Sequence, residues 1–305
     1  MTDRMEPVLG EAGTFSGINV DWLFKSQGFG ITRWDCSHGR REMSDEKCQP
    51  WHVIGFVHSG AFVLHAQGKS ALIDSTAVLL YNPEEPYRSE HPYGCCDHGS
   101  AIAVRQETLL DVLVHHDPAA EARAEAMFLS AYAHGLSRPY LLQRLLLQSL
   151  RSNGPREPMA VEAAVLRILG EVARGCSRLN GKPARRRDPD RARRDYVEDA
   201  KALLQRRFQE NLRLEDLGQA LHVSTYHLCR LFKEQTGMPI HRYLNQLRLR
   251  QALEAIAAGE EDLCGLALSL GFSSHSHFTT SFRKEFGISP REARGPLVPG
   301  GSARL

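Results

Sequence analysis

The stretch LEDLGQALHVSTYHLCRLFKEQTG, residues 214–237, decides the fold of the C-terminal part of the chain, because a diverged copy follows it. The copy is LCGLALSLGFSSHSHFTTSFRKEFG, residues 263–287, with one inserted residue. Each copy has apolar residues at helical spacing, a turn, a second amphipathic helix and a closing glycine. This is the layout of a helix-turn-helix, and two such units predict contact with DNA at two places. The matching positions are Leu214 and Leu263, Leu217 and Leu266, Leu221 and Leu270, Ser224 and Ser273, Leu228 and Phe278, Phe232 and Phe282, Lys233 and Arg283, and Gly237 and Gly287.

The length and composition bound what the chain can be. With 305 residues it is long enough for two domains, each with its own core. It contains no apolar run long enough to span a membrane, and its N-terminus lacks the apolar centre of a signal peptide, so we expect a cytoplasmic protein without a membrane partner. The net charge of +2 is too small to indicate DNA binding by itself. Seven cysteines, an odd number, argue against a disulfide scaffold in a reducing compartment.

The N-terminal half has the pattern of a β domain. Residues 52–59 and 61–67 are β-prone runs separated by Ser59-Gly60, which predicts a hairpin, and a second turn is expected at 67–69. A further strand over 77–83 ends at a proline. Strands at this spacing predict an antiparallel sandwich or barrel.

From about residue 106 the apolar period becomes helical. Asp117-Pro118 and Ser137-Arg138-Pro139 have the composition of helix starts, and another helix is expected over 161–172. We expect these helices to pack on the barrel and to supply a dimer surface. The whole chain is therefore predicted to be α+β: a sensing and dimerisation domain over 1–180, and an all-α DNA-binding domain over 195–305.

The two predicted domains are joined by an arginine-rich linker at 181–194, which has no apolar period. A solvated tether is favoured over specific phosphate contacts, although its charge would attract DNA non-specifically.

Within the C-terminal domain, the two helix-turn-helix units are separated by an apolar-periodic segment, residues 240–258. As one helix it would be about 28 Å long. Successive major-groove faces lie ~34 Å apart, so such a helix could hold two reading helices about one DNA turn apart. Ser224 is expected to cap the first recognition helix and Gly237 to end it; Ser273 or Ser274 is expected to cap the second.

The polar face of each recognition helix supplies the candidate DNA contacts, because side chains in its N-terminal half reach base edges and later cations reach phosphates. For several of them a solvated or locally packed surface role is the alternative. The candidates are Thr225, Tyr226, His227, Cys229, Arg230 and Lys233 in the first unit, and His275, Ser276, His277, Thr280, Arg283 and Lys284 in the second.

The segment GFSSHSHFTTSFRKEFGISPREAR, which begins at Gly271, resembles the C-terminal signature of the AraC/XylS transcription regulators. The resemblance covers residues 195–295 and rests on Gly271, Phe272, Ser274, Phe278, Phe282, Arg283, Gly287, Pro290 and Arg294. It implies a transcription regulator with two helix-turn-helix units in adjacent major-groove segments. It also implies base-reading positions at Tyr226, Cys229 and Arg230, and at His275, Ser276, His277 and Thr280. Thr280 stands where the family often has arginine, and Cys229 where a stronger polar group is common.

The resemblance also implies an N-terminal cupin-like domain that binds a small-molecule effector and forms a homodimer, with RNA polymerase as a further candidate partner. Whether the regulator activates or represses is left open.

Cysteines and histidines gather in three short motifs of the N-terminal half: WDCSH, CQPWH and GCCDH. Thiolates and imidazoles suit zinc, copper(I) and other soft metals, and adjacent cysteines also suit redox chemistry. Ordinary barrel residues around an organic-effector pocket are the favoured alternative. The candidate metal or thiol-sensor residues are Cys36, Cys48, Cys95 and Cys96.

No enzymatic activity and no cofactor are expected. A cupin-type metal-dependent oxygenase with a helical appendix is the rival interpretation, with Glu84, Glu85 and His91 as its carboxylates and histidine. The closely spaced histidine pair of such a site is missing from this part of the sequence. A helical adaptor that binds partner proteins is a second rival, but the predicted exposed faces lack the apolar anchors that it would need.

Overall fold

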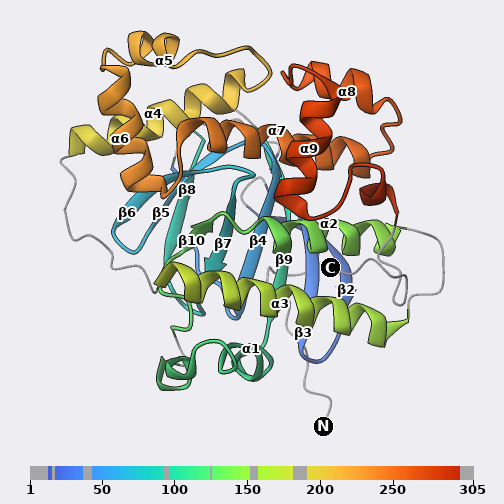
Figure 1. The fold of residues 1–305 in the computed structure, drawn as a ribbon. Helices are drawn as coiled ribbons and strands as arrows, with labels where there is room; N and C mark the ends of the chain where they lie inside the picture. Colours follow the sequence, from blue (N-terminus) through green and yellow to red (C-terminus); the bar gives the residue numbers. More distant parts are fainter. Residues whose placement is uncertain are drawn as a thin grey trace. The chain divides into compact units, whose positions relative to one another are not determined.

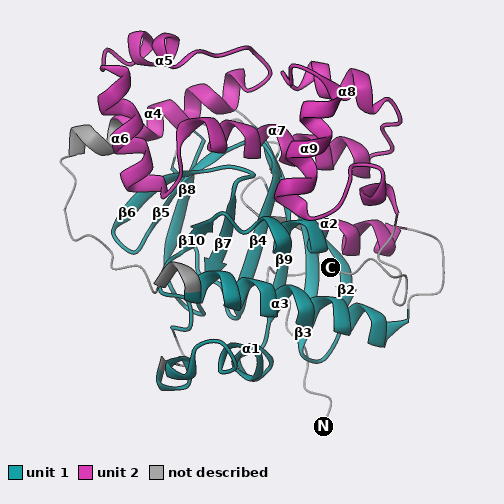
Figure 2. Cartoon of the chain, viewed as in Figure 1, with its two compact units in different colours: residues 1–143, 153–182 teal, residues 144–152, 183–305 magenta. Residues whose placement is uncertain are grey.

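The computed structural model describes residues 13–15, 18–36, 43–91, 96–123, 126–151, 157–180 and 191–295. The chain divides into two compact units, residues 1–143 with 153–182 and residues 144–152 with 183–305 (Figure 2). Within the described ranges, no helix has both the length and the apolar character that crossing a membrane requires.

The first unit is built on antiparallel strands, which Figure 1 shows in blue to green. A seven-stranded sheet has the order β1-β2-β3-β9-β4-β7-β10, and a three-stranded sheet has the order β6-β5-β8. The strands are β1 (Gly13–Phe15), β2 (Ile18–Lys25), β3 (Phe29–Cys36), β4 (His52–Ser59), β5 (Phe62–Ala66), β6 (Lys69–Ile73), β7 (Ala77–Tyr81), β8 (Tyr87–Glu90), β9 (Asp97–Val104) and β10 (Tyr132–His134).

The expected strands are present, but the hairpin predicted at Ser59-Gly60 was wrong. β4 pairs with β7 and β9, whereas β5 pairs with β6 and β8, so the chain passes from one sheet to the other at Gly60. Gly60 has a φ of 78°, and a Cβ there would lie 2.1 Å from the backbone oxygen of Cys96. Glycine is therefore required by close packing at a crossover and does not mark a two-residue turn.

The turn predicted at 67–69 is confirmed. Ala66 pairs with Lys69, and the two residues between them, Gln67 and Gly68, both have positive φ. Two positive φ values in a two-residue loop are the geometry that matches strand twist in hairpins. The strand predicted over 77–83 is also confirmed as β7.

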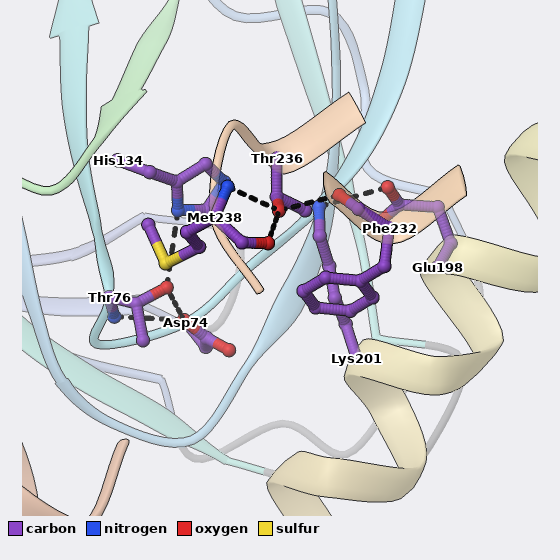
Figure 3. A network of polar contacts seen from close by, with 8 residues as sticks. All are labelled: Asp74, Thr76, His134, Glu198, Lys201, Phe232, Thr236 and Met238. Carbon is purple, nitrogen blue, oxygen red and sulfur yellow. Dashed lines mark hydrogen bonds and ion pairs between the residues drawn. The ribbon is translucent and has the colours of Figure 1, made fainter. Parts of the chain in front are cut away.

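The helices of the N-terminal half are α1 (Gln106–Leu113), α2 (Ser137–Arg151) and α3 (Pro158–Asn180), with a short 3-10 helix η1 (Pro118–Arg123). Helical structure therefore begins at both of the starts read from the sequence. The first half of α2 packs on the sheet through Tyr140, which is fully buried with its ring edge-on to Phe56. In the same unit, the Thr76 hydroxyl donates to Asp74 Oδ1 (2.7 Å) and lies 3.2 Å from His134 Nδ1, which fastens β10 to the turn before β7 (Figure 3).

The second unit contains only helices in the part that is described, apart from the loops between them. Antiparallel sheets in the N-terminal part and a helical C-terminal domain confirm the α+β fold class. The helix α4 begins at Arg191, inside the stretch expected to be linker; residues 181–190 lie outside the described ranges. The helices are α4 (Arg191–Arg207), α5 (Leu214–Ala220), α6 (Thr225–Thr236), α7 (Ile240–Ala257), α8 (Leu263–Ser269) and α9 (His275–Phe286), followed by the 3-10 helix η2 (Glu292–Arg294).

Candidate nucleic-acid interface

The first helix-turn-helix unit consists of α5 and α6. Ser224 caps α6, its hydroxyl oxygen accepting a hydrogen bond from the His227 backbone N–H at 3.3 Å, and Gly237 ends the helix in the left-handed conformation. In the last turn of α6, the Thr236 hydroxyl lies 2.7 Å from the Phe232 carbonyl oxygen (Figure 3). The Ser224 cap and the Gly237 end are the ones expected from the sequence. Leu228, Leu231 and Phe232 are buried against α4, α5 and α7.

The second helix-turn-helix unit consists of α8 and α9 and repeats this design. Asp262 caps α8 by accepting from the backbone N–H groups of Cys264 and Gly265. Of the two serines expected to cap α9, the structure selects Ser274, whose hydroxyl oxygen accepts from the His277 backbone N–H at 3.1 Å. The inserted residue of the second copy therefore lies before the cap, in the turn.

The core of the second unit is aromatic. Phe278, Phe282 and Phe286 are buried, with ring centroids 5.7 Å and 4.6 Å apart along the helix. Their spacing of four residues places them on one stripe, as predicted.

The helix α7 joins the two units, and Figure 1 shows α5–α6 and α8–α9 at its opposite ends. Its 18 residues make it about 27 Å long. The predicted helix is present and its apolar positions Ile240, Leu247, Ala252 and Ile256 are buried. Three polar side chains of α7 are buried as well: Gln246, Arg248 and Arg250. A helix that packs against neighbours on several sides buries residues all round.

Arg248 is the clearest cross-brace in this domain. Its guanidinium donates to the carbonyl oxygens of Phe208 (2.7 Å) and Glu210 (2.8 Å), which follow α4, and it lies 5.8 Å from the centre of the Phe272 ring in the second unit. Burial lowers the pKa of Arg248, but a guanidinium remains charged. Gln246 adds a second link, donating to Glu285 of α9 at 2.7 Å. The two units are therefore held together by more than a single helical connection.

Gly271 lies against this brace. Its φ is 82°, and a Cβ there would be 2.6 Å from the Gln209 carbonyl oxygen and 2.7 Å from Arg248 Nη2. Both the backbone conformation and the space require glycine.

The structure places most of the candidate DNA contacts on open faces. In α6, Tyr226, Arg230 and Lys233 are exposed at i, i+4 and i+7, and Tyr226 is 80% exposed, which is unusual for so large an aromatic side chain. Thr225 and His227 are half-buried. In α9 all six candidates are exposed: His275, Ser276, His277, Thr280, Arg283 and Lys284.

Two candidates have local partners as well. Cys229 is half-buried and packs against the core of the first helix-turn-helix unit, so its thiol is poorly placed for a base edge. The His277 ring lies edge-on to Phe272, with Nδ1 3.1 Å from the Ser273 hydroxyl, which fixes its orientation at the start of α9. The i, i+4, i+7 pattern of α6 recurs in α9 as Ser276, Thr280 and Arg283, so both helices present similarly spaced polar groups.

A family model described as a helix-turn-helix domain matches residues 217–295, which run from within α5 through α6, α7, α8 and α9 to η2. Residues 217–295 form an AraC-type helix-turn-helix domain.

Curated relatives match between about a third and a half of this chain. The chain is 39% identical over 93 residues to the HTH-type transcriptional activator RhaS of Escherichia fergusonii, covering 30% of this chain and 34% of that protein. It is 29% identical over 144 residues to RhaS of Pectobacterium atrosepticum, covering 47% and 49%. The chain thus spans between a third and a half of the length of these curated relatives. A solved AraC-type regulator structure from Chromobacterium violaceum is 30% identical, covering 34% of this chain and 94% of that chain with a TM-score of 0.32.

The N-terminal compact unit, residues 1–143 with 153–182, has a cavity of about 470 Å³, within the size range of small-molecule sites. Val53, Phe62, Leu79 and Tyr81 are among its apolar lining residues. Its polar lining includes Lys47, Gln49, His91 and Asp97.

The predicted cysteine set does not assemble in the part of the chain that is described. Cys36 is buried, whereas Cys48 and Cys96 are exposed, and Cys95 lies outside the described residues. Cys36 instead meets His91 and Asp97, and these three are the group of metal-binding residue types found among the described residues. Asp97 was not recognised from the sequence, although it lies inside the GCCDH motif and its strand pairs with β3.

Glu84 and Glu85, the carboxylates of the rival oxygenase site, are not in this group. Glu84 Oε2 lies 3.8 Å from the Cys48 thiol, and Glu85 accepts a hydrogen bond from Asn82 at 2.9 Å.

Burial lowers the pKa of His91, but its hydrogen bonds to Asp97 and Cys36 outweigh that effect and raise it to about 10. Without another cation between these groups, His91 is therefore an imidazolium paired with the Asp97 carboxylate.

Proposed function

We propose that the chain is a sequence-specific DNA-binding transcription regulator whose two recognition helices, α6 and α9, enter successive major-groove segments. The observation that carries this proposal is the pair of capped helices with open polar faces at the two ends of α7. A helix about 27 Å long is suited to hold two such helices about one turn of DNA apart. The resemblance to proteins named as transcriptional activators supports the same conclusion.

Within this proposal, the exposed side chains divide by position. Tyr226 and Arg230 of α6, and Ser276 and Thr280 of α9, belong to the halves of the helices that reach base edges. Lys233, Arg283 and Lys284 lie in the later turns, where cations reach phosphates. Arg230 is the side chain best suited to discriminate bases, because its fork can bond guanine at two atoms.

In this proposal the N-terminal compact unit, residues 1–143 with 153–182, receives the signal that regulates DNA binding. Its cavity is large enough for a small organic molecule, and most of its lining is apolar. A ligand there would regulate DNA binding by favouring one arrangement of the chain over another. The homodimer and the RNA polymerase contact implied by the resemblance, and the cytoplasmic location expected from the N-terminal sequence, also belong to this proposal.

The test is the binding of full-length protein to a duplex selected from a random pool. In the Arg230→Ala variant we expect affinity for the selected duplex to fall by about 1–3 kcal/mol while binding to random duplex changes little. Lys233→Ala, one turn further along the same face, is the matched control and should weaken both by similar factors. Equal losses on both duplexes for Arg230→Ala would assign it to phosphate, and failure to enrich any sequence would refute the proposed function.

A further inference from the structure

Three different metal-binding groups meet at one buried point of the N-terminal compact unit: the side chains of Cys36, His91 and Asp97. Cys36 ends β3 and Asp97 begins β9, and the two residues are direct cross-strand partners. His91 follows the last residue of β8, which belongs to the smaller sheet. Two sheets thus contribute to one cluster, and its ligand atoms all lie within 4.8 Å of one another.

The contacts of His91 distinguish this cluster from a catalytic relay. Cys36 Sγ lies 3.8 Å from His91 Nε2, and Asp97 Oδ1 lies 2.5 Å from the same nitrogen. A Cys-His-Asp relay needs the thiol and the carboxylate on opposite ring nitrogens, so that the base can take one proton while the acid orients the other. Here the sulfur, nitrogen and oxygen all converge on one point, which is the arrangement of ligands around an ion.

The distances are near those that a metal requires. Bonds of 2.0–2.3 Å at tetrahedral angles separate neighbouring ligand atoms by about 3.3–3.7 Å. The observed 3.8 Å and 2.5 Å fall on either side of this range, so a shift of about 1 Å or less of His91 relative to Asp97 would admit the ion.

The surroundings hold the ligands in place. The Trp34 indole N–H donates to Asp97 Oδ2 at 3.0 Å, which leaves Oδ1 directed at the cluster. The His91 ring packs against Phe62 at 5.9 Å between ring centres. Support of this kind orients metal ligands and raises their affinity. His91 and Asp97 also line the cavity, so a further coordination position can face it.

We propose that Cys36, His91 and Asp97 bind one Zn²⁺ ion, with a remaining coordination position directed at the cavity. The ligand set selects the metal: thiolate and imidazole exclude Mg²⁺ and Ca²⁺, and the carboxylate disfavours copper(I). Three protein ligands with one position open to water or to a molecule in the cavity is the coordination of reactive zinc sites. The site is separate from the DNA-binding domain, and its test does not depend on the proposed function.

The experiment uses full-length protein, reduced, treated with a chelator and titrated with Co²⁺, which replaces zinc in such sites. We expect a thiolate-to-cobalt charge-transfer band that saturates at one equivalent and is abolished by one equivalent of Zn²⁺. Cys36→Ser should remove this band, while Cys264→Ser, at an exposed cysteine of α8, should keep it. Asp97→Asn should retain the band and weaken Co²⁺ binding at least tenfold. Azide should shift the cobalt d–d bands of the wild-type protein if a position is open.

The wild-type titration decides the proposal without any variant. No charge-transfer band, or saturation only at several equivalents, would show that the cluster is a buried His91–Asp97 ion pair with a neighbouring thiol. A band that survives in Cys36→Ser and disappears in Cys264→Ser would place the metal elsewhere. Azide without effect would refute the open position.

Discussion

Replacing Gly271 by alanine tests whether the cross-brace at Arg248 holds the two helix-turn-helix units together. The substitution adds one methyl group where the chain has a φ of 82° and where the Arg248 guanidinium and the Gln209 carbonyl oxygen would lie 2.7 Å and 2.6 Å from the new Cβ. Real Cβ atoms do not approach other heavy atoms this closely, so the guanidinium or the backbone must move.

Two contributions set the expected loss. A non-glycine residue in the left-handed region costs about 1–2 kcal/mol. Moving Arg248 breaks at least one of its hydrogen bonds to the Phe208 and Glu210 carbonyl oxygens, each worth about 1.5–3 kcal/mol because the donor is charged. Together they predict that the free energy of unfolding of the DNA-binding domain falls by about 2.5–5 kcal/mol.

Gly287 provides the matched control. It ends α9 with a φ of 81°, but a Cβ there would meet nothing within 4 Å, so Gly287→Ala carries only the backbone contribution of about 1–2 kcal/mol. Urea unfolding of the full-length variants, followed by far-ultraviolet circular dichroism, compares the two. Equal losses for Gly271→Ala and Gly287→Ala would refute the bracing role of Arg248.

Two further predictions concern single side chains. Ser274→Ala should destabilise α9 by about 1 kcal/mol because it removes the cap, whereas Ser273→Ala should have a smaller effect; urea unfolding measures both, and the reverse order would exchange their roles. Burial lowers the pKa of His52 to about 4. The free energy of unfolding of the N-terminal compact unit should therefore be intact above pH ~6.5 and fall by about 3 kcal/mol as the pH drops toward 4. Tryptophan fluorescence reports this unit alone, since Trp22, Trp34 and Trp51 all lie in it; an unchanged pH dependence in His52→Gln would contradict the prediction.

The recognition helices could be predicted from the sequence because their signals are local. The stripe Phe278, Phe282 and Phe286 fixes the buried face of α9, and Gly237 and Gly287 mark helix ends that the structure confirms. The burial pattern of the connecting helix α7 was harder to predict, because the burial of Arg248 and Arg250 depends on neighbours that a single sequence does not reveal.

In the N-terminal compact unit, too, contacts between distant parts of the chain could not be predicted from the sequence. Strand positions followed from residue type, but the pairing of β4 with β9 joins segments about 45 residues apart, and local spacing favoured the wrong hairpin. The Cys36–Asp97 pairing likewise depends on the register of β3 and β9. A search for soft ligands in the sequence found Cys36 and missed its carboxylate partner.

Hydroxyl-radical footprinting of the full-length protein on a selected duplex tests most directly whether α7 spaces two reading helices along one DNA. We predict two protected segments with centres about 10–10.5 base pairs apart on one face of the duplex. Thr280→Ala together with Arg283→Ala should weaken protection of one segment and leave the other. A single protected segment, or two segments on opposite faces, would contradict this account.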